Sequence, residues 1–164
     1  MSMISVVIPV YNEEGNLEAL HRRLSALEKP GGDRYELIFV DDGSRDGSRE
    51  IIRRLAAADP RVRYVFFSRN FGHEQATTAG LDRAAGDAAV IIDSDLQDPP
   101  ELIPEMVSRW REGYQIVYAQ RRRRKGESVF KRATSWLFYR LVRKMSDCDI
   151  PPDTGDFRLI DRRV

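Results

Sequence analysis

Residues 88–101 change from apolar to acidic and then to proline-containing sequence: Ala88-Ala-Val-Ile-Ile-Asp-Ser-Asp-Leu-Gln-Asp-Pro-Pro-Glu101. The stretch opens with an apolar run, which is typical of a strand buried on both faces. Asp93 and Asp95 follow at alternate positions. Pro99 and Pro100 then favour the start of a helix, because proline is tolerated in the first helical turn. The stretch therefore predicts a strand, an acidic turn and a helix.

The same alternation of strand and helix extends in both directions. Apolar runs predict further strands at Ile4–Val10, Leu37–Val40, Val62–Phe67 and Ile116–Ala119. Apolar residues at helical spacing predict helices at Leu17–Leu27, around 51–55, at Glu74–Ala85 and at Pro99–Glu112. This order predicts an α/β domain, Rossmann-like, with a mostly parallel sheet and helices on both faces.

Polar clusters follow three of the predicted strands: Tyr11-Asn-Glu13, Asp41-Asp42 and Asp93-Ser-Asp95. In open α/β sheets, ligands bind outside the carboxyl ends of the strands. We therefore expect these clusters to form one site.

Asp93 and Asp95 indicate a divalent metal. Alternate positions of an extended segment point the same way, so the two carboxylates would face a common point. Oxygen ligands favour Mg²⁺ or Mn²⁺, and Gln97 is spaced to add a carbonyl oxygen. The alternative is an acidic loop that caps the next helix.

Asp41 and Asp42 are suited to accept hydrogen bonds from a base N–H or from ribose hydroxyls. The alternative is an Asx turn and helix cap, which is the interpretation we favour for Asp46. The dinucleotide motif G-x-G-x-x-G is missing after the first strand, and no P-loop motif occurs anywhere in the sequence.

Composition excludes several other classes of protein. The 164 residues suit one domain. Cys148 is the single cysteine, which excludes a disulfide framework, and two histidines are too few for a His-rich metal centre. No apolar run reaches the ~20 residues of a membrane span, and the start lacks the features of a signal peptide. A cytoplasmic location is expected.

The net charge of +1 hides a strong asymmetry. Residues 1–120 sum to −6, residues 121–144 to +9 and residues 145–164 to −2. A block this basic usually faces phosphate groups, although it can be a solvated helix face. Within residues 129–146, an apolar stripe with aromatic residues runs beside the charge, as in helices that lie on a membrane surface. The alternative is a core-packing helix with a basic outer face.

Four ordered motifs resemble family 2 glycosyltransferases over essentially the whole chain: Val7-Ile-Pro-Val-Tyr-Asn-Glu13, Asp41-Asp-Gly-Ser44, Asp93-Ser-Asp-Leu-Gln-Asp-Pro-Pro-Glu101 and Gly155-Asp-Phe-Arg-Leu159. The chain is most similar to the branch that contains dolichol-phosphate mannosyltransferases and bactoprenol glucosyltransferases. The resemblance implies a GT-A fold, a nucleoside-diphosphate sugar donor, a divalent metal and a polyprenyl-phosphate acceptor.

The resemblance also implies roles for individual residues. The nucleotide pocket would be lined by Pro9, Tyr11, Glu13, Asp41 and Asp42. Asp93, Asp95 and Gln97 would hold the metal and diphosphate. Arg121 would meet a phosphate. Asp156 would lie near the acceptor, as a base or as a group that orients substrate.

Members of this branch usually continue into membrane helices, so the chain is expected to be truncated before them. We predict a donor-binding region at 1–120 and a basic acceptor or membrane-interface segment at 121–164 of the same domain. The expected location is the cytoplasmic face of an anionic membrane. The sequence leaves the sugar, the nucleobase and the oligomeric state open, a homo-oligomer included.

The implied reaction is an inverting displacement, in which a lipid phosphate oxygen attacks the anomeric carbon and a nucleoside diphosphate leaves. Three other functions account for part of the pattern. A glycosyltransferase with a saccharide hydroxyl or other soluble acceptor would share every donor residue. A nucleotidyltransferase fits poorly, because the loop after the first strand is acidic. A nucleic-acid-binding module would leave the acidic clusters unexplained, so no nucleic acid is expected.

Overall fold

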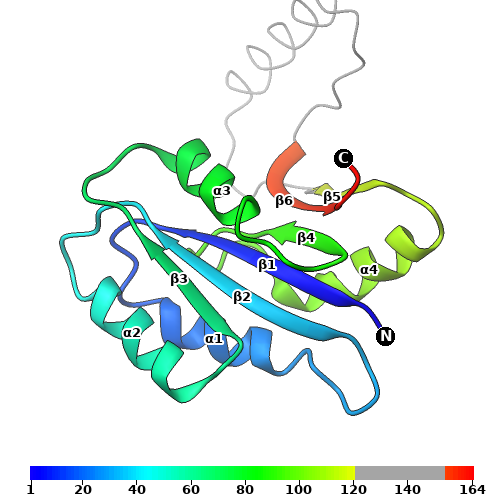
Figure 1. Cartoon of the computed structure of the whole chain (residues 1–164), viewed down its shortest axis with the longest axis horizontal. Helices are drawn as coiled ribbons and strands as arrows, with labels where there is room; N and C mark the ends of the chain where they lie inside the picture. The colour runs from blue at the N-terminus through cyan, green and yellow to red at the C-terminus, as the bar shows by residue number, and fades with distance from the viewer. Residues whose placement is uncertain (121–153) are drawn as a thin grey trace, which may run out of the picture. The chain divides into compact units, whose positions relative to one another are not determined.

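The computed structural model describes residues 1–120 and 154–164. In this part of the chain, six strands form one sheet in the order β3-β2-β1-β4-β6-β5 (Figure 1). Their bounds are β1 Met3–Val10, β2 Arg34–Asp41, β3 Val62–Phe66, β4 Ala88–Ile91, β5 Ile116–Gln120 and β6 Thr154–Asp161. Strands β1, β2, β3 and β4 pair in parallel, whereas β6 is antiparallel to β4. The predicted mostly parallel α/β sheet is confirmed.

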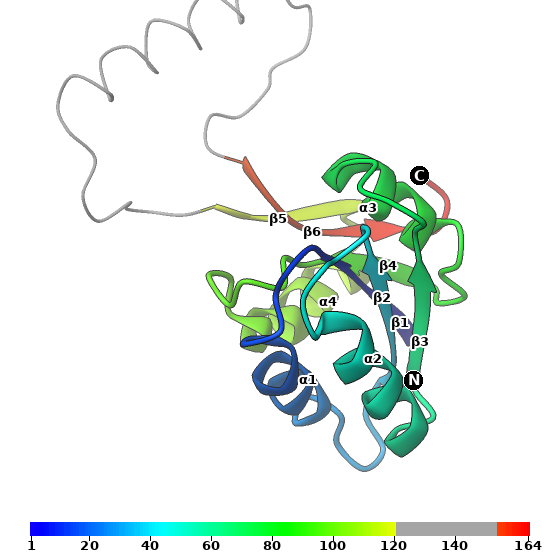
Figure 2. The same ribbon diagram turned by 90° about the vertical axis from the view of Figure 1, so that its left-hand side faces the viewer.

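The helices cover both faces of the sheet. Their bounds are α1 Leu17–Ser25, α2 Ser48–Ala58, α3 His73–Leu81, the 3₁₀ turn η1 Pro100–Leu102 and α4 Ile103–Arg111. Helices α1, α2 and α4 lie on one side, and α3 lies on the other (Figure 2). No helix in the described ranges is both long enough and apolar enough to span a bilayer.

Helix α3 sits close to the sheet because it contributes a glycine at the contact. A Cβ atom built on Gly80 would lie 2.3 Å from Val7 Cγ1 and 3.1 Å from Val40 Cγ2. Both valines are fully buried. The missing side chain therefore lets the helix backbone approach β1 and β2, and it brings the start of α3 to the carboxyl edge of the sheet.

Strand β6 was not predicted, although the Gly155-Asp-Phe-Arg-Leu159 motif lies on it. Asp156–Val164 belong to the same compact unit as Met1–Tyr118, and Ala119–Gly155 form a second unit. From Asp156 to Asp161 the side chains of β6 alternate between half-buried and buried, with Phe157 and Leu159 almost fully buried. The functional division into 1–120 and 121–164 stays a prediction.

A buried polar cluster lies at the amino-terminal end of the strands. Glu36 on β2 is 4% exposed and accepts hydrogen bonds from the Ser5 hydroxyl, the Ala85 N–H at 2.6 Å and Arg63 at 3.1 Å. The Ser5 hydroxyl in turn accepts the Gly86 N–H at 2.9 Å. The backbone of 85–86 is thus drawn onto the sheet, which explains why α3 ends at Leu81, before the predicted end at Ala85.

The pKa of Glu36 reflects both its burial and these hydrogen bonds. Burial alone raises the pKa of the carboxyl, but the hydrogen bonds from Ser5, Ala85 and Arg63 outweigh it and lower the pKa below its usual value. A carboxyl with a lower pKa in the folded chain stabilises the fold above its unfolded pKa of about 4.3, and that contribution is lost as the pH falls.

We expect Glu36→Gln to lower the free energy of unfolding at pH 7 by about 1–3 kcal/mol, because buried donors lose their charged acceptor. The difference from the unsubstituted chain should shrink as the pH falls below about 4.3. Urea unfolding at pH 7 and at pH 3.5 or so measures both effects. Glu50→Gln is the matched control, since the Glu50 side chain is 77% exposed; equal losses in the two variants would contradict the assignment.

Candidate functional site

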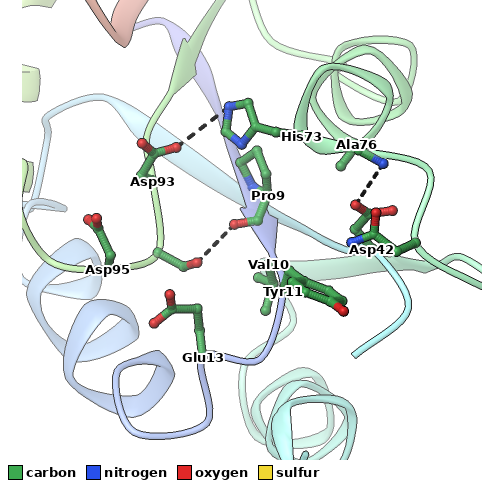
Figure 3. Close-up of a pocket in the computed structure, with 12 residues that line it drawn as sticks. Pro9, Val10, Tyr11, Glu13, Asp42, His73, Ala76, Asp93 and Asp95 are labelled. Atoms are coloured by element: carbon green, nitrogen blue, oxygen red, sulfur yellow. Dashed lines mark hydrogen bonds and ion pairs between the residues drawn. The ribbon is translucent and has the colours of Figure 1, made fainter. Parts of the chain in front are cut away.

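A cavity of about 350 Å³ opens at the carboxyl ends of β1, β2 and β4 (Figure 3). It is lined by Pro9, Val10, Tyr11, Glu13, Asp42, Asn70, Gly72, His73, Ala76, Asp93, Ser94 and Asp95. Six of these had been singled out from the sequence: Pro9, Tyr11, Glu13, Asp42, Asp93 and Asp95. Asp93 and Asp95 lie on one side of the cavity and Asp42 on the other, with Pro9 between them (Figure 3).

The loops after β1 and β2 are bound to each other along their length. The Asn12 N–H donates to the Ser44 hydroxyl at 2.9 Å, and Asn12 Oδ1 accepts the Arg45 N–H at 2.9 Å. Glu14 Oε2 accepts the Gly47 N–H at 2.6 Å. Asn12 holds a left-handed backbone with φ 56°, a conformation that asparagine tolerates better than most residues. This wall of the cavity is therefore well ordered before any ligand arrives.

Asp46 has the local structural role expected from the sequence. Its Oδ1 accepts the Ser48 N–H at 3.0 Å at the start of α2, and its Oδ2 accepts the Glu14 N–H at 3.1 Å. Partial burial raises the pKa of Asp46, but the hydrogen bonds lower it overall. Asp46 thus joins the two loops from outside the cavity.

Asp42 lines the cavity and also has a structural role. Its two carboxylate oxygens accept the Phe71 N–H at 2.6 Å and the Gly72 N–H at 2.9 Å. These amides come just before α3, so the end of β2 sets the position at which α3 begins. The side chain is almost fully buried by these contacts.

Asp41 points away from the cavity, as alternation along a strand requires. Its Oδ2 accepts hydrogen bonds from Arg49 Nε at 2.6 Å and from the Ser44 N–H at 3.2 Å. Arg49 also donates to the Phe67 carbonyl. The Oδ1 atom is buried and has no hydrogen-bond partner among the residues that the structure describes. A contact between Asp41 and a nucleotide stays a prediction.

The acidic turn after β4 is held at its centre. The Ser94 hydroxyl is buried and donates to the Pro9 carbonyl at 2.9 Å, which ties the turn to β1. With Ser94 turned inward, Asp93 and Asp95 on either side both reach the cavity. Asp95 Oδ1 accepts the Gln97 N–H at 3.0 Å, across Leu96 at φ 62°. The Gln97 side chain is exposed and does not line the cavity, so its role as a metal ligand stays a prediction.

Asp93 has an unusual electrostatic environment. Burial raises its pKa, the nearby His73 opposes that shift, and the carboxylates of Asp156, Asp95 and Asp98 add to it; the net shift is upward. His73 Nε2 lies 3.7 Å from Asp93 Oδ1 and 3.5 Å from Asp156 Oδ2. Asp156 is thus brought to the site from the far end of the sequence.

The donor set suits a cation that is shared with a phosphate ligand. Across residues 1–120 and 154–164, no three His, Cys, Asp or Glu side chains converge closely enough to hold a metal without help. Mg²⁺ is commonly held by one or two carboxylates, with substrate phosphates and water completing its shell. Asp93 and Asp95 match that pattern. Arg121 and the basic amphipathic segment lie outside the described residues.

Sequence reasoning missed His73 and Asn70, which line the cavity from the connection between β3 and α3. A usable signal was present. The residues after the third predicted strand, Asn70-Phe-Gly-His73, are also at a carboxyl strand end, where a parallel sheet collects its ligand contacts. Ser94 was not predicted as a site residue. Its hydroxyl holds the acidic turn in place through the hydrogen bond to the Pro9 carbonyl.

Comparison with known proteins places the chain in a family. Residues 5–164 match the profile of Glycosyl transferase family 2. The uncharacterized glycosyltransferase YkcC of Bacillus subtilis (strain 168) is 56% identical over 98% of the chain and 50% of its own length. The bactoprenol glucosyl transferase of Shigella phage SfV is 42% identical over 98% of the chain and 52% of its own length.

Solved structures agree with the sequence matches. Glucosyl-3-phosphoglycerate synthase from Mycobacterium tuberculosis, in complex with Mn²⁺, UDP and phosphoglyceric acid, superposes with a TM-score of 0.71 at 28% identity. The match covers 99% of this chain and 56% of the synthase. The chain spans about half the length of the curated relatives that it matches. With its mostly parallel sheet and its cavity at the strand ends, the chain belongs to glycosyl transferase family 2 and has the GT-A fold.

Proposed function

We propose that the chain is the catalytic region of an inverting glycosyltransferase that moves a sugar from a nucleoside-diphosphate sugar to a polyprenyl phosphate. The observation that carries the proposal is that Asp93 and Asp95 line one cavity of a family 2 domain, with Asp156 3.5 Å from the cavity residue His73. The relative from Shigella phage SfV is named a bactoprenol glucosyl transferase, which supports a lipid phosphate as the acceptor.

The nucleotide would bind against the interlocked loops after β1 and β2. Pro9, Tyr11 and Glu13 line this wall, and the Tyr11 ring is 45% exposed, which leaves its face free to contact a base or ribose. Asp42 stands at the same wall but already accepts two backbone amides, so it supports the wall as well as contacting the ligand.

The diphosphate would lie beside Asp93 and Asp95 with Mg²⁺ or Mn²⁺, and Gln97 is the further predicted ligand. When bound, the metal would neutralise negative charge on the departing diphosphate. Asp93 and Asp95 would hold that cation, and the Ser94 hydrogen bond to the Pro9 carbonyl positions their turn relative to the nucleotide wall. The cavity is otherwise acidic, so a cation is needed before a polyanion can enter.

The acceptor phosphate would approach from the Asp156 side. A phosphate monoester has a second pKa of about 6, so its attacking oxygen is already ionised near neutral pH. Asp156 is therefore suited to orient the acceptor or the sugar and is less needed as a strong base. Attack opposite the leaving diphosphate inverts the anomeric configuration. Arg121 would neutralise charge on a phosphate.

The proposed reaction is tested by incubating the protein with undecaprenyl phosphate and, in turn, UDP-glucose, UDP-N-acetylglucosamine and GDP-mannose, each with Mn²⁺. We expect one donor to give a glycosylated lipid, detected by mass spectrometry, and Asp156→Asn to lower the rate of its formation strongly while leaving it measurable. Soluble phosphorylated and saccharide acceptors are the controls. Transfer to a soluble acceptor with none to the lipid would refute the acceptor assignment.

The metal assignment predicts that UDP affinity depends on the cation. Removal of Mn²⁺ by EDTA, or the substitution Asp95→Ala, should weaken UDP binding by at least about tenfold, because charge-assisted contacts to the diphosphate are lost. Isothermal titration calorimetry measures this directly. Asp82→Ala is the matched control, since Asp82 is exposed at the end of α3. Equal affinity with and without metal would contradict the role of Asp93 and Asp95.

The basic segment predicts association with anionic membranes. Because residues 121–144 carry a net charge of +9, the protein should co-sediment with phosphatidylglycerol liposomes and much less with neutral ones. Salt should weaken binding, since the Debye length falls from about 10 Å at 0.1 M to about 3 Å at 1 M. Replacing Phe130, Trp136 and Phe138 by Ser should remove the binding that survives high salt. Equal binding to both kinds of liposome would count against a membrane-facing segment.

A further inference from the structure

His73 occupies a central position that the reaction described above does not use. It is the first residue of α3 and lines the cavity, and its ring is directed toward Asp93 (Figure 3). Its Nε2 atom lies within 4 Å of two carboxylates, 3.7 Å from Asp93 Oδ1 and 3.5 Å from Asp156 Oδ2. Among the cavity-lining side chains in the described ranges, it alone can carry a positive charge.

The pairing of β4 with β6 explains why two carboxylates meet at this point. The strands are antiparallel, and Ile91 pairs with Arg158. If this register continued for two more residues, Asp93 would face Asp156, and both carboxylates lie within 4 Å of His73 Nε2. Like charges directly opposite each other on paired strands repel. An N–H group that donates a hydrogen bond to one of them, while close to the other, can hold the pair together.

The backbone that carries His73 is fixed from the neighbouring strand. Asp42 accepts the Phe71 and Gly72 N–H groups, and Gly72 has a φ of 104°, which only glycine adopts readily. A Cβ atom on Gly43 would lie 2.4 Å from the Arg69 carbonyl carbon, so the two loops are in direct contact. The imidazole is therefore presented to the carboxylates by a rigid entry into α3.

We propose that His73 is a positioning residue for the transfer reaction: its Nε2–H holds the Asp156 carboxylate beside Asp93, on the acceptor side of the cavity. The inference rests on the proposed function, because it assigns Asp156 to the acceptor side. His73 acts through Asp156 and does not bind the nucleotide. A neutral imidazole with its hydrogen on Nε2 suffices for this role.

The test compares three variants of the full chain. His73→Phe keeps a ring but removes the nitrogen that lies 3.5 Å from Asp156, so we expect kcat for transfer to fall about 10- to 100-fold, the usual effect of losing a polar contact to a charged group. His73→Gln retains an N–H near the position of Nε2 and should keep more of the activity. The affinity for UDP with Mn²⁺ should change less than about twofold in both. His21→Gln is the matched control, because His21 is paired with Asp59 at 2.9 Å on the opposite side of the sheet.

A double-mutant cycle with Asp156→Asn separates a positioning role from a general structural one. If His73 acts through Asp156, adding His73→Phe to Asp156→Asn should cause little further loss of kcat. Additive losses would overturn the proposal. So would an unchanged kcat in His73→Phe, or a loss of UDP affinity as large as the loss of kcat.

Hydrolysis of the same donor by water, measured in parallel, distinguishes this inference from the proposed function. Hydrolysis needs no lipid, yet water would attack the anomeric carbon from the same side as the lipid phosphate does in the proposed transfer. Hydrolysis that depends on His73 and Asp156, with no transfer to undecaprenyl phosphate, would refute the lipid acceptor and support the role of His73. Lipid transfer that is indifferent to His73 would refute the inference and leave the proposed function in place.

Discussion

Strand β4 is short, but the geometry of the site depends on its pairing. It is parallel to β1 on one side and antiparallel to β6 on the other. The parallel pairing brings the acidic turn after β4 to the same edge as the loop after β1. The antiparallel pairing brings Asp156 to that edge as well, from a strand that begins where β4 ends. A shift of one residue in the β4–β6 register would turn Asp156 to the other face, because side chains alternate along a strand.

The amino-terminal ends of the strands have a structural role, whereas the carboxyl ends form the candidate site. At the amino-terminal end, Glu36 accepts hydrogen bonds from Ser5, Arg63 and the Ala85 N–H, so its buried charge is compensated within the fold. At the carboxyl end, carboxylates gather with few donors of their own, and burial keeps the pKa of Asp93 raised. Charge that is balanced internally stabilises a fold, whereas charge left for a ligand to balance creates a binding site.

The cavity wall derives its order from polar contacts between loops. Asn12, Glu14 and Asp46 join the loop after β1 to the loop after β2, and Asp42 joins the latter to the start of α3. If the loops keep these contacts when a ligand binds, their backbone needs little rearrangement. Such preorganisation reduces the entropy that binding must overcome and keeps reacting groups aligned.

Much of the fold and half of the cavity lining followed from local sequence pattern. Apolar runs identified the five strands from β1 to β5. The rule that ligands gather at carboxyl strand ends selected Tyr11, Glu13, Asp42, Asp93 and Asp95, and the family resemblance added Pro9. This worked because strand burial and period are local properties. The sixth strand escaped prediction, because its alternating segment is short and its partner β4 lies more than 60 residues away in the chain.

Tertiary structure alone decided which of those residues face the cavity and which stabilise the fold. Asp41 and Asp42 are adjacent and chemically identical, yet one is turned inward to Arg49 and the other lines the cavity. The role of His73 could not be predicted from the sequence, since it depends on contacts with Asp93 after β4 and with Asp156 on β6 that no spacing encodes. The sequence by itself determined which elements form and which edge of the sheet collects the polar residues. The packing of α3 against β1 and β2, and the register of β6, decided which of those residues meet, because both depend on contacts between segments far apart in the chain.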